Sequence, residues 1–142
     1  MNSREHHSTR LLPFSRQQVF QAHADPARLT QWWGPNGFSS TFHQFEFHNG
    51  GRWHFTFHGP DGRNNDNEWM FREIVANERI DFDHLSAPRF RLLITLHDEA
   101  GQTRLNWRAT FETAEILAGI RHIIAPANEQ NFDRLETLLA RP

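Results

Sequence analysis

Cysteine, lysine and tyrosine are all absent from this chain of 142 residues. Without cysteine, neither a disulfide framework nor a thiolate nucleophile is possible. Without lysine and tyrosine, there is no Schiff-base amine, no phosphate-loop lysine and no phenolic acid. The side chains left for acid, base or nucleophilic chemistry are therefore histidine, aspartate, glutamate and serine.

Strong net charge and long apolar runs are missing as well. The formal net charge is −2, which gives no reason to expect nucleic acid or an anionic membrane surface as a partner. No apolar run approaches the length of a membrane span or a signal-peptide core, so we expect no membrane insertion and a soluble, cytoplasmic protein. The length fits a single domain, which we place at residues 9–140. Residues 1–8 have no apolar pattern and are predicted to be a flexible terminus.

Aromatic residues are what the chain has in excess, with 13 Phe and 5 Trp. Many of them fall at alternate positions. Trp53, Phe55 and Phe57 alternate with polar residues after the turn Asn49-Gly50-Gly51, and Phe45 and Phe47 alternate before it. A period of two on both sides of a glycine turn is typical of a β-hairpin with one aromatic face.

The remaining elements follow from the same patterns. Further strands are predicted at 9–12, 68–75, 79–85, 90–96 and 105–111. Ser15 with Gln18 forms a capping-box pattern, and Asp25-Pro26 opens a second short helix that must end before Gly34-Pro35. A long helical period follows Thr113, with a kink or a break predicted near residues 125–128 because of Pro126. This order predicts an α+β fold, in which helices cover one face of an antiparallel sheet.

Four segments of the chain together resemble a known family: QWWGP at 31–35, NGGRWHF at 49–55, FREIVANERIDFDH at 71–84 and NFDRLETLL at 131–139. In their order and spacing they are similar to the START-like (SRPBCC), helix-grip superfamily, and within it to the group named for homology to activators of the heat-shock-protein-90 ATPase. The resemblance covers residues 10–139. It implies a curved antiparallel sheet of about six to seven strands wrapped around a long C-terminal helix, with two short helices after the first strand. It also implies a cavity that often admits apolar or aromatic small molecules.

The side chains expected to line that cavity are the inward aromatic residues and the apolar residues of the last helix. One of Trp32 and Trp33 should seal the core while the other faces the cavity, although both could instead be ordinary core residues. The predicted pocket consists of Trp32, Trp33, Phe45, Phe47, Trp53, Phe55, Trp69, Phe71, Phe82, His84, Phe90, Trp107, Phe111, Ile120, Ile123 and Phe132.

Histidines are numerous, at 10, but few are placed for chemistry. His84 continues the inward face of its strand, so it is either a hydrogen-bonded core residue or a weak catalytic candidate. Asp81 and Asp83 should be exposed and are unconvincing as an acid and base pair. His54 and His58 lie roughly 13 Å apart along one strand, too far to share an ion unaided. We therefore expect neither a metal site nor a cofactor.

Three functions remain compatible with the sequence. The first is a carrier, sensor or sequestering protein for an apolar or aromatic small molecule. The second is an enzyme of the cyclase or dehydratase kind, with His84 moving protons in the same cavity. The third is a chaperone-interacting module, which would make a protein the partner and which rests on the family name alone. The pathway and the oligomeric state stay open.

Overall fold

The structure of the protein is a computed structural model that describes residues 3–141. Seven strands and three helices follow one another along the chain. Their bounds are β1 Glu5–Leu12, α1 Arg16–Ala24, α2 Pro26–Leu29, β2 Ser39–Phe45, β3 Arg52–His58, β4 Asn64–Val75, β5 Arg79–His84, β6 Phe90–Glu99, β7 Gln102–Phe111 and α3 Ala114–Leu139.

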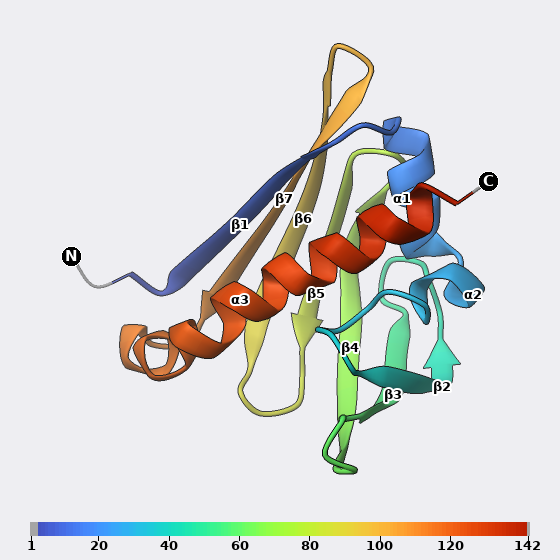
Figure 1. The fold of residues 1–142 in the computed structure, drawn as a ribbon. Coiled ribbons are helices and arrows are strands. Elements are labelled where there is room, and N and C mark those ends of the chain that lie inside the picture. Colours follow the sequence, from blue (N-terminus) through green and yellow to red (C-terminus); the bar gives the residue numbers. More distant parts are fainter. Residues whose placement is uncertain (1–2, 142) are drawn as a thin grey trace.

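All seven strands form one sheet in the order β1-β7-β6-β5-β4-β3-β2, and every neighbouring pair is antiparallel. Five consecutive pairs are neighbours in sequence, and β1 alone crosses over to pair with β7. Figure 1 shows α3 lying diagonally across one face of the sheet, with α1 and α2 beside its C-terminal end. The predicted α+β fold, with its long C-terminal helix gripped by an antiparallel sheet, is confirmed.

Strand β1 begins at Glu5, earlier than the predicted start at residue 9. Residues 5–8, which we predicted to be flexible, pair with β7 from Glu5 opposite Thr110 onwards. The inward side chains here are His6 and Ser8, both buried. Because neither is apolar, the hydrophobic pattern could not reveal this half of the strand. Residues 1 and 2 lie outside the described residues.

Local capping explains where the helices start. The Ser15 hydroxyl accepts from the backbone N–H of Gln18, whose side chain accepts from the backbone of Ser15, so the predicted capping box is confirmed. The side chains of Asp25 and Thr113 cap α2 and α3 by accepting from the backbone N–H groups of Ala27 and Ile116.

Helix α3 continues through Pro126, so of the predicted kink or break, the break does not occur. A proline inside a helix costs about 3 kcal/mol, because it removes one backbone hydrogen bond and crowds the preceding turn. The buried residues Leu117 on one side of Pro126 and Phe132 and Leu135 on the other hold both halves against the rest of the protein and offset that cost. Figure 1 draws α3 as one uninterrupted helix.

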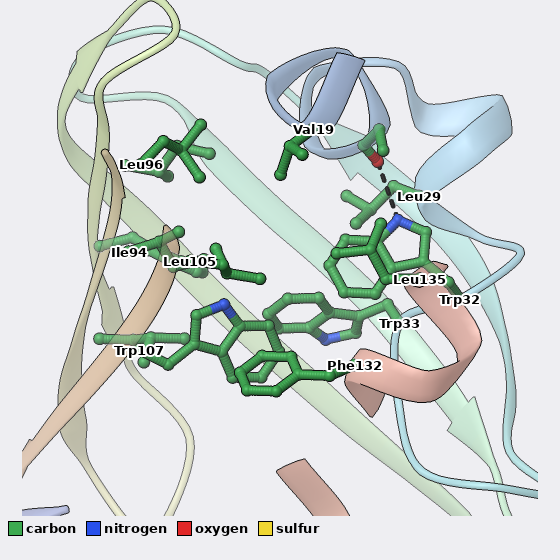
Figure 2. Packing of buried hydrophobic residues seen from close by; sticks show 14 of the residues in the cluster. Val19, Leu29, Trp32, Trp33, Ile94, Leu96, Leu105, Trp107, Phe132 and Leu135 are labelled. Carbon is green, nitrogen blue, oxygen red and sulfur yellow. Dashed lines mark hydrogen bonds between the residues drawn. The ribbon is translucent and has the colours of Figure 1, made fainter. Parts of the chain in front are cut away.

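The core lies between the sheet and the helices and is mainly aromatic. Trp53 and Trp107 both point inward, which confirms the predicted phase of alternation. In Figure 2, Trp107 and Phe132 meet across the interface between β7 and α3, with ring centroids 4.8 Å apart. The dashed line in the same view is the hydrogen bond from the Trp32 indole Nε1 to the carbonyl of Ala22, at 2.9 Å.

Asp81 is an exception to the simple in-and-out pattern, because it is only 7% exposed where we predicted a solvated side chain. The guanidinium of Arg91, on the neighbouring strand β6, donates two hydrogen bonds to its carboxylate, at 2.8 and 2.5 Å. The long arginine side chain shields the shorter aspartate from water. Asp83 stays partly exposed and lies 3.3 Å from Arg72.

Candidate ligand cavity

A cavity of about 340 Å³ lies between the sheet and the N-terminal half of α3. Its walls come from β3 to β7, from the loop after Trp33 and from one side of α3. The lining residues are Trp33, Gly34, Pro35, Phe57, Asn67, Trp69, His84, Pro88, Phe90, Leu92, Trp107, Ala109, Phe111, Ile120, Ile123, Ile124, Asn128 and Asn131. Most of this surface is apolar, and none of these residues carries a carboxylate, ammonium or guanidinium group.

The apolar part of the helical wall consists of Ile120, Ile123 and Ile124. Ile123 is 57% exposed, an unusual state for a large aliphatic side chain. Only Leu117 is buried in this half of α3, whereas several residues are buried after Pro126. The helix is therefore held to the core mainly by its C-terminal half.

The two adjacent tryptophans have different surroundings. Trp32 is fully buried against His23 and belongs to the core. Trp33 lines the cavity, and its ring lies 5.2 Å from the rings of both Trp53 and Trp107. Both tryptophans lie in the turn that follows α2, which ends at Leu29, so neither is held to one face of a helix.

That turn is tied directly to α3. The Asn131 side chain accepts from the backbone N–H of Gly34 and donates to the carbonyl of Trp32. Arg134 donates to the carbonyls of Gly34 and Pro35, at 2.8 and 3.0 Å. Gly34 has a φ of +105°, and a Cβ added to it would lie 2.9 Å from the Phe57 ring, so only glycine fits.

The structure brings half of the predicted pocket residues to this cavity. Those on its wall are Trp33, Trp69, His84, Phe90, Trp107, Phe111, Ile120 and Ile123. The others lie in the packed core or against it, outside the lining of this cavity: Trp32, Phe45, Phe47, Trp53, Phe55, Phe71, Phe82 and Phe132.

Several lining residues were not among those predicted. Leu92 and Ala109 share the phase of Phe90 and Trp107, so the alternation that identified their neighbours could also have found them. Asn67 and Asn128 carried no signal, because isolated asparagines are usually solvated.

His84 is the one titratable group on the wall, and both of its ring nitrogens are occupied. Nδ1 lies 2.9 Å from the carbonyl of Pro88, and Nε2 lies 2.8 Å from the side-chain amide of Asn67. Burial lowers the pKa of His84, so the ring is neutral near pH 7. A neutral ring has one N–H, and the carbonyl can only accept it. Nδ1 therefore donates to Pro88. Nε2 lies against Oδ1 of Asn67, and it can accept a hydrogen bond there only when the amide is turned so that its NH₂ group faces the ring.

Two of the tryptophans on the wall, Trp69 and Trp107, have buried indole N–H groups with no hydrogen-bond partner in the described part of the chain. Their rings lie among other rings, with Trp69 4.7 Å from His84 and 5.4 Å from Phe90. Because these nitrogens are covered, they are not presented to the cavity. Two of the asparagines on the wall are tied to other parts of the protein, because Asn131 bonds to Trp32 and Gly34 and Asn128 donates its NH₂ group to Ser8.

Within residues 3–141, no helix combines the length and the apolar character that crossing a membrane requires.

Comparison with known proteins gives a family and a fold. The family model described as "Activator of Hsp90 ATPase homolog 1-like protein" matches residues 13–140. No curated protein matches the chain.

Solved structures with the same fold come from several bacteria. A protein from Arthrobacter aurescens superposes with a TM-score of 0.89 at 22% identity, covering 99% of this chain and 88% of its own. A protein from Chromobacterium violaceum superposes with a TM-score of 0.87 at 20% identity, covering 97% of this chain and 99% of its own. The AHSA1 protein from Silicibacter pomeroyi superposes with a TM-score of 0.78 at 17% identity, covering 96% of this chain and 97% of its own. At these identities the likeness shows the fold alone.

Proposed function

Since the chain belongs to the Activator of Hsp90 ATPase homolog 1-like family, we propose that it uses the cavity of that helix-grip fold to bind an apolar, aromatic small molecule. The activity is binding without chemical conversion, as in a carrier, a sensor or a sequestering protein.

The observation that carries the proposal is the cavity itself, at about 340 Å³ with an aromatic and aliphatic wall. Small-molecule sites occupy about 300 to 1,000 Å³ and are lined mainly by apolar side chains with a few polar groups. The rings of Trp33, Trp69 and Phe90 offer faces and edges on which an aromatic ligand can pack. The volume, at the low end of that range, favours a compact ligand.

The state of His84 favours binding over catalysis. A general acid or base must present a nitrogen to the ligand, and both nitrogens of His84 are used by Pro88 and Asn67. None of the described residues that line the cavity carries a carboxylate to form an acid and base pair with it. The enzyme alternative would need His84 to leave these partners. The chaperone-interacting alternative has only the family description in its support.

Native mass spectrometry of the full chain purified from its own host tests the proposal. We expect a population heavier by one small molecule, and this extra mass should be lost on denaturation. The matched control is Ala109→Phe, which fills the cavity from a lining position and should carry no extra mass. Equal extra mass on both proteins, or none on either, would argue against a ligand in this cavity.

Replacing His84 by alanine separates carrier from enzyme. A carrier should lose about 1 kcal/mol of ligand affinity at most, because the ring's hydrogen bonds are made within the protein. An enzyme that depends on this imidazole should lose turnover by roughly a hundredfold or more while still binding.

A further inference from the structure

The outer face of the sheet, opposite the cavity, carries a line of polar side chains across β2, β3 and β4. On this face Thr56 of β3 lies opposite Thr41 of β2 and Asp66 of β4. His54 of β3 points the same way as Thr56, because residues two apart share a face. Three neighbouring strands thus contribute imidazole, hydroxyl and carboxylate groups to one small area.

A β-bulge brings a second histidine into this area. The register between β2 and β3 shifts between Phe42 and Gln44, so His43 is the extra residue. Phe42 and Phe45 both pack inward against Trp53, which leaves His43 and Gln44 between them without an inward position. Bulges redirect side chains in this way and are over-represented beside functional sites. The His43 ring accordingly lies 4.8 Å from the ring of His54.

The two imidazoles converge with one carboxylate. One ligand atom from each of His43, His54 and Asp66 lies within 4.8 Å of the other two. Nε2 of His54 is 3.7 Å from the Asp66 carboxylate. Thr56 connects the other pair, because its hydroxyl donates to Asp66 at 2.7 Å and lies 2.7 Å from Nε2 of His43. This hydroxyl holds an imidazole and a carboxylate in position beside each other.

We propose that His43, His54 and Asp66 form a binding site for a divalent transition-metal ion, with Zn²⁺ as the reference ion. Two imidazole nitrogens and one carboxylate oxygen are a donor set that suits zinc and its neighbours, whereas magnesium and calcium take oxygen donors. Three protein ligands would leave a fourth position for water or for another ligand.

The geometry needs only a small adjustment. Bond lengths of about 2.0 to 2.2 Å at a tetrahedral zinc ion place ligand atoms roughly 3.3 Å apart. The ligand atoms must therefore move closer than their present separation of up to 4.8 Å. The side chains of His43 and Asp66 are exposed at the sheet surface, so they can rotate to close this gap without disturbing the core. Nε2 of His43 would exchange its bond to Thr56 for the metal, and Thr56 would keep its bond to Asp66.

This proposal departs from our sequence-based expectation, which considered His54 and His58 alone. His58 is directed elsewhere, to Thr41 at 2.7 Å and to Asn64 at 2.9 Å. His43 could not be recognised as a partner of His54 without the bulge, because a regular strand would have placed its side chain differently.

Zinc titration of the tag-free full chain, first freed of metal by a chelator, tests the proposal by calorimetry. We expect one Zn²⁺ per chain with a dissociation constant of about 10 µM or tighter, which corresponds to roughly 7 kcal/mol. His43→Ala, His54→Ala and Asp66→Ala should each weaken binding at least about tenfold. Co²⁺ should give the visible absorption of a low-coordinate ion in the wild type and lose it in the double variant H43A/H54A.

The matched control is His58→Ala, which removes a histidine from the same face of the same strand and should leave zinc affinity unchanged. Circular dichroism and a thermal melt of each apo variant establish that the fold is retained. Wild-type affinity in H43A/H54A, or wild-type binding weaker than about 0.1 mM, would overturn the proposal. Because this site and the cavity are on opposite faces of the sheet, zinc should not change occupancy of the cavity, and either proposal can fail alone.

Discussion

The two halves of α3 face the same sheet but meet it in different ways. After Pro126, the side chains of Phe132, Leu135 and Leu139 are buried in the core. Before Pro126, Leu117 alone is buried, and Ile123 is 57% exposed at the wall of the cavity. One continuous helix thus closes the core with one half and covers a cavity with the other. The difference teaches that one half of the helix mainly anchors it to the core while the other mainly borders the cavity, and it can be tested residue by residue.

The largest effect is expected from Phe132→Ala in the packed half. Phe132 is fully buried against Trp107, so its removal deletes a large apolar contact and leaves a cavity. Substitutions of this kind cost about 3–5 kcal/mol. Urea unfolding should show this loss in the free energy of unfolding. A loss below about 1 kcal/mol would mean that the C-terminal half of α3 does not anchor the helix.

A pH effect of almost the same size should come from His23, which is buried against Trp32 in the packed region. Burial lowers its pKa from the ordinary value of 6.5 to about 4. Below pH 6.5 the unfolded chain therefore binds more protons at this residue than the folded chain does. The free energy of unfolding should fall as the pH is lowered from 6.5 to 4, by about 1.4 kcal/mol per unit in the middle of this range, and this contribution should be flat above 6.5.

The matched variant for that measurement is His23→Leu, which cannot titrate. Urea unfolding at a series of pH values should give a flatter curve for the variant between pH 6.5 and 4. Parallel curves for the two proteins would show that folding does not lower the pKa of His23. His84, whose pKa burial also lowers, should contribute in the same direction.

A smaller effect on stability is expected from Ala109→Phe on the cavity wall. Adding a ring to a well-packed core typically costs 1–3 kcal/mol. Here the added ring can enter a cavity of about 340 Å³, so we expect a loss below about 1 kcal/mol. Thermal and urea unfolding measure this difference. A loss of several kcal/mol would show that the space cannot accept a ring.

The smallest effect is expected from Ile123→Ala in the same half of α3. Its side chain is already more than half exposed, so truncation removes little buried area. The free energy of unfolding should change by no more than about 0.5 kcal/mol. A loss comparable with that of Phe132→Ala would erase the distinction between the two halves of the helix.

The sheet could be predicted from the sequence because one face of each strand is strongly aromatic. Trp53 and Phe55 on β3, and Trp107 on β7, set the phase of their strands without ambiguity. Likewise, the Ser15 cap lies in a local pattern that spans only four residues, from Ser15 to Gln18. His6 and Ser8 show the limit of this reasoning. Their side chains point inward but are polar, so only the pairing with β7 identifies this segment as a strand.

The candidate site was less predictable. Alternation identifies the face of the sheet on which a side chain lies, but it does not tell whether that side chain packs in the core or lines the cavity. Phe82 and Phe90 share an inward face, yet Phe82 is packed in the core and Phe90 lines the cavity. The outcome depends on where α3 contacts the sheet, which is a tertiary property. The bulge at His43 was hidden for a similar reason, because it appears only when β2 is aligned with β3.

Titration with N-phenyl-1-naphthylamine, an uncharged aromatic probe, tests the central claim most directly. The probe should quench tryptophan fluorescence on binding to the wild-type protein, because Trp33, Trp69 and Trp107 line the cavity. We predict a dissociation constant near 1 µM, or about 8 kcal/mol, and a loss of at least a hundredfold in Ala109→Phe. Affinity unchanged by Ala109→Phe, or no saturable quenching of the wild-type protein, would contradict the assignment of this cavity as a ligand site.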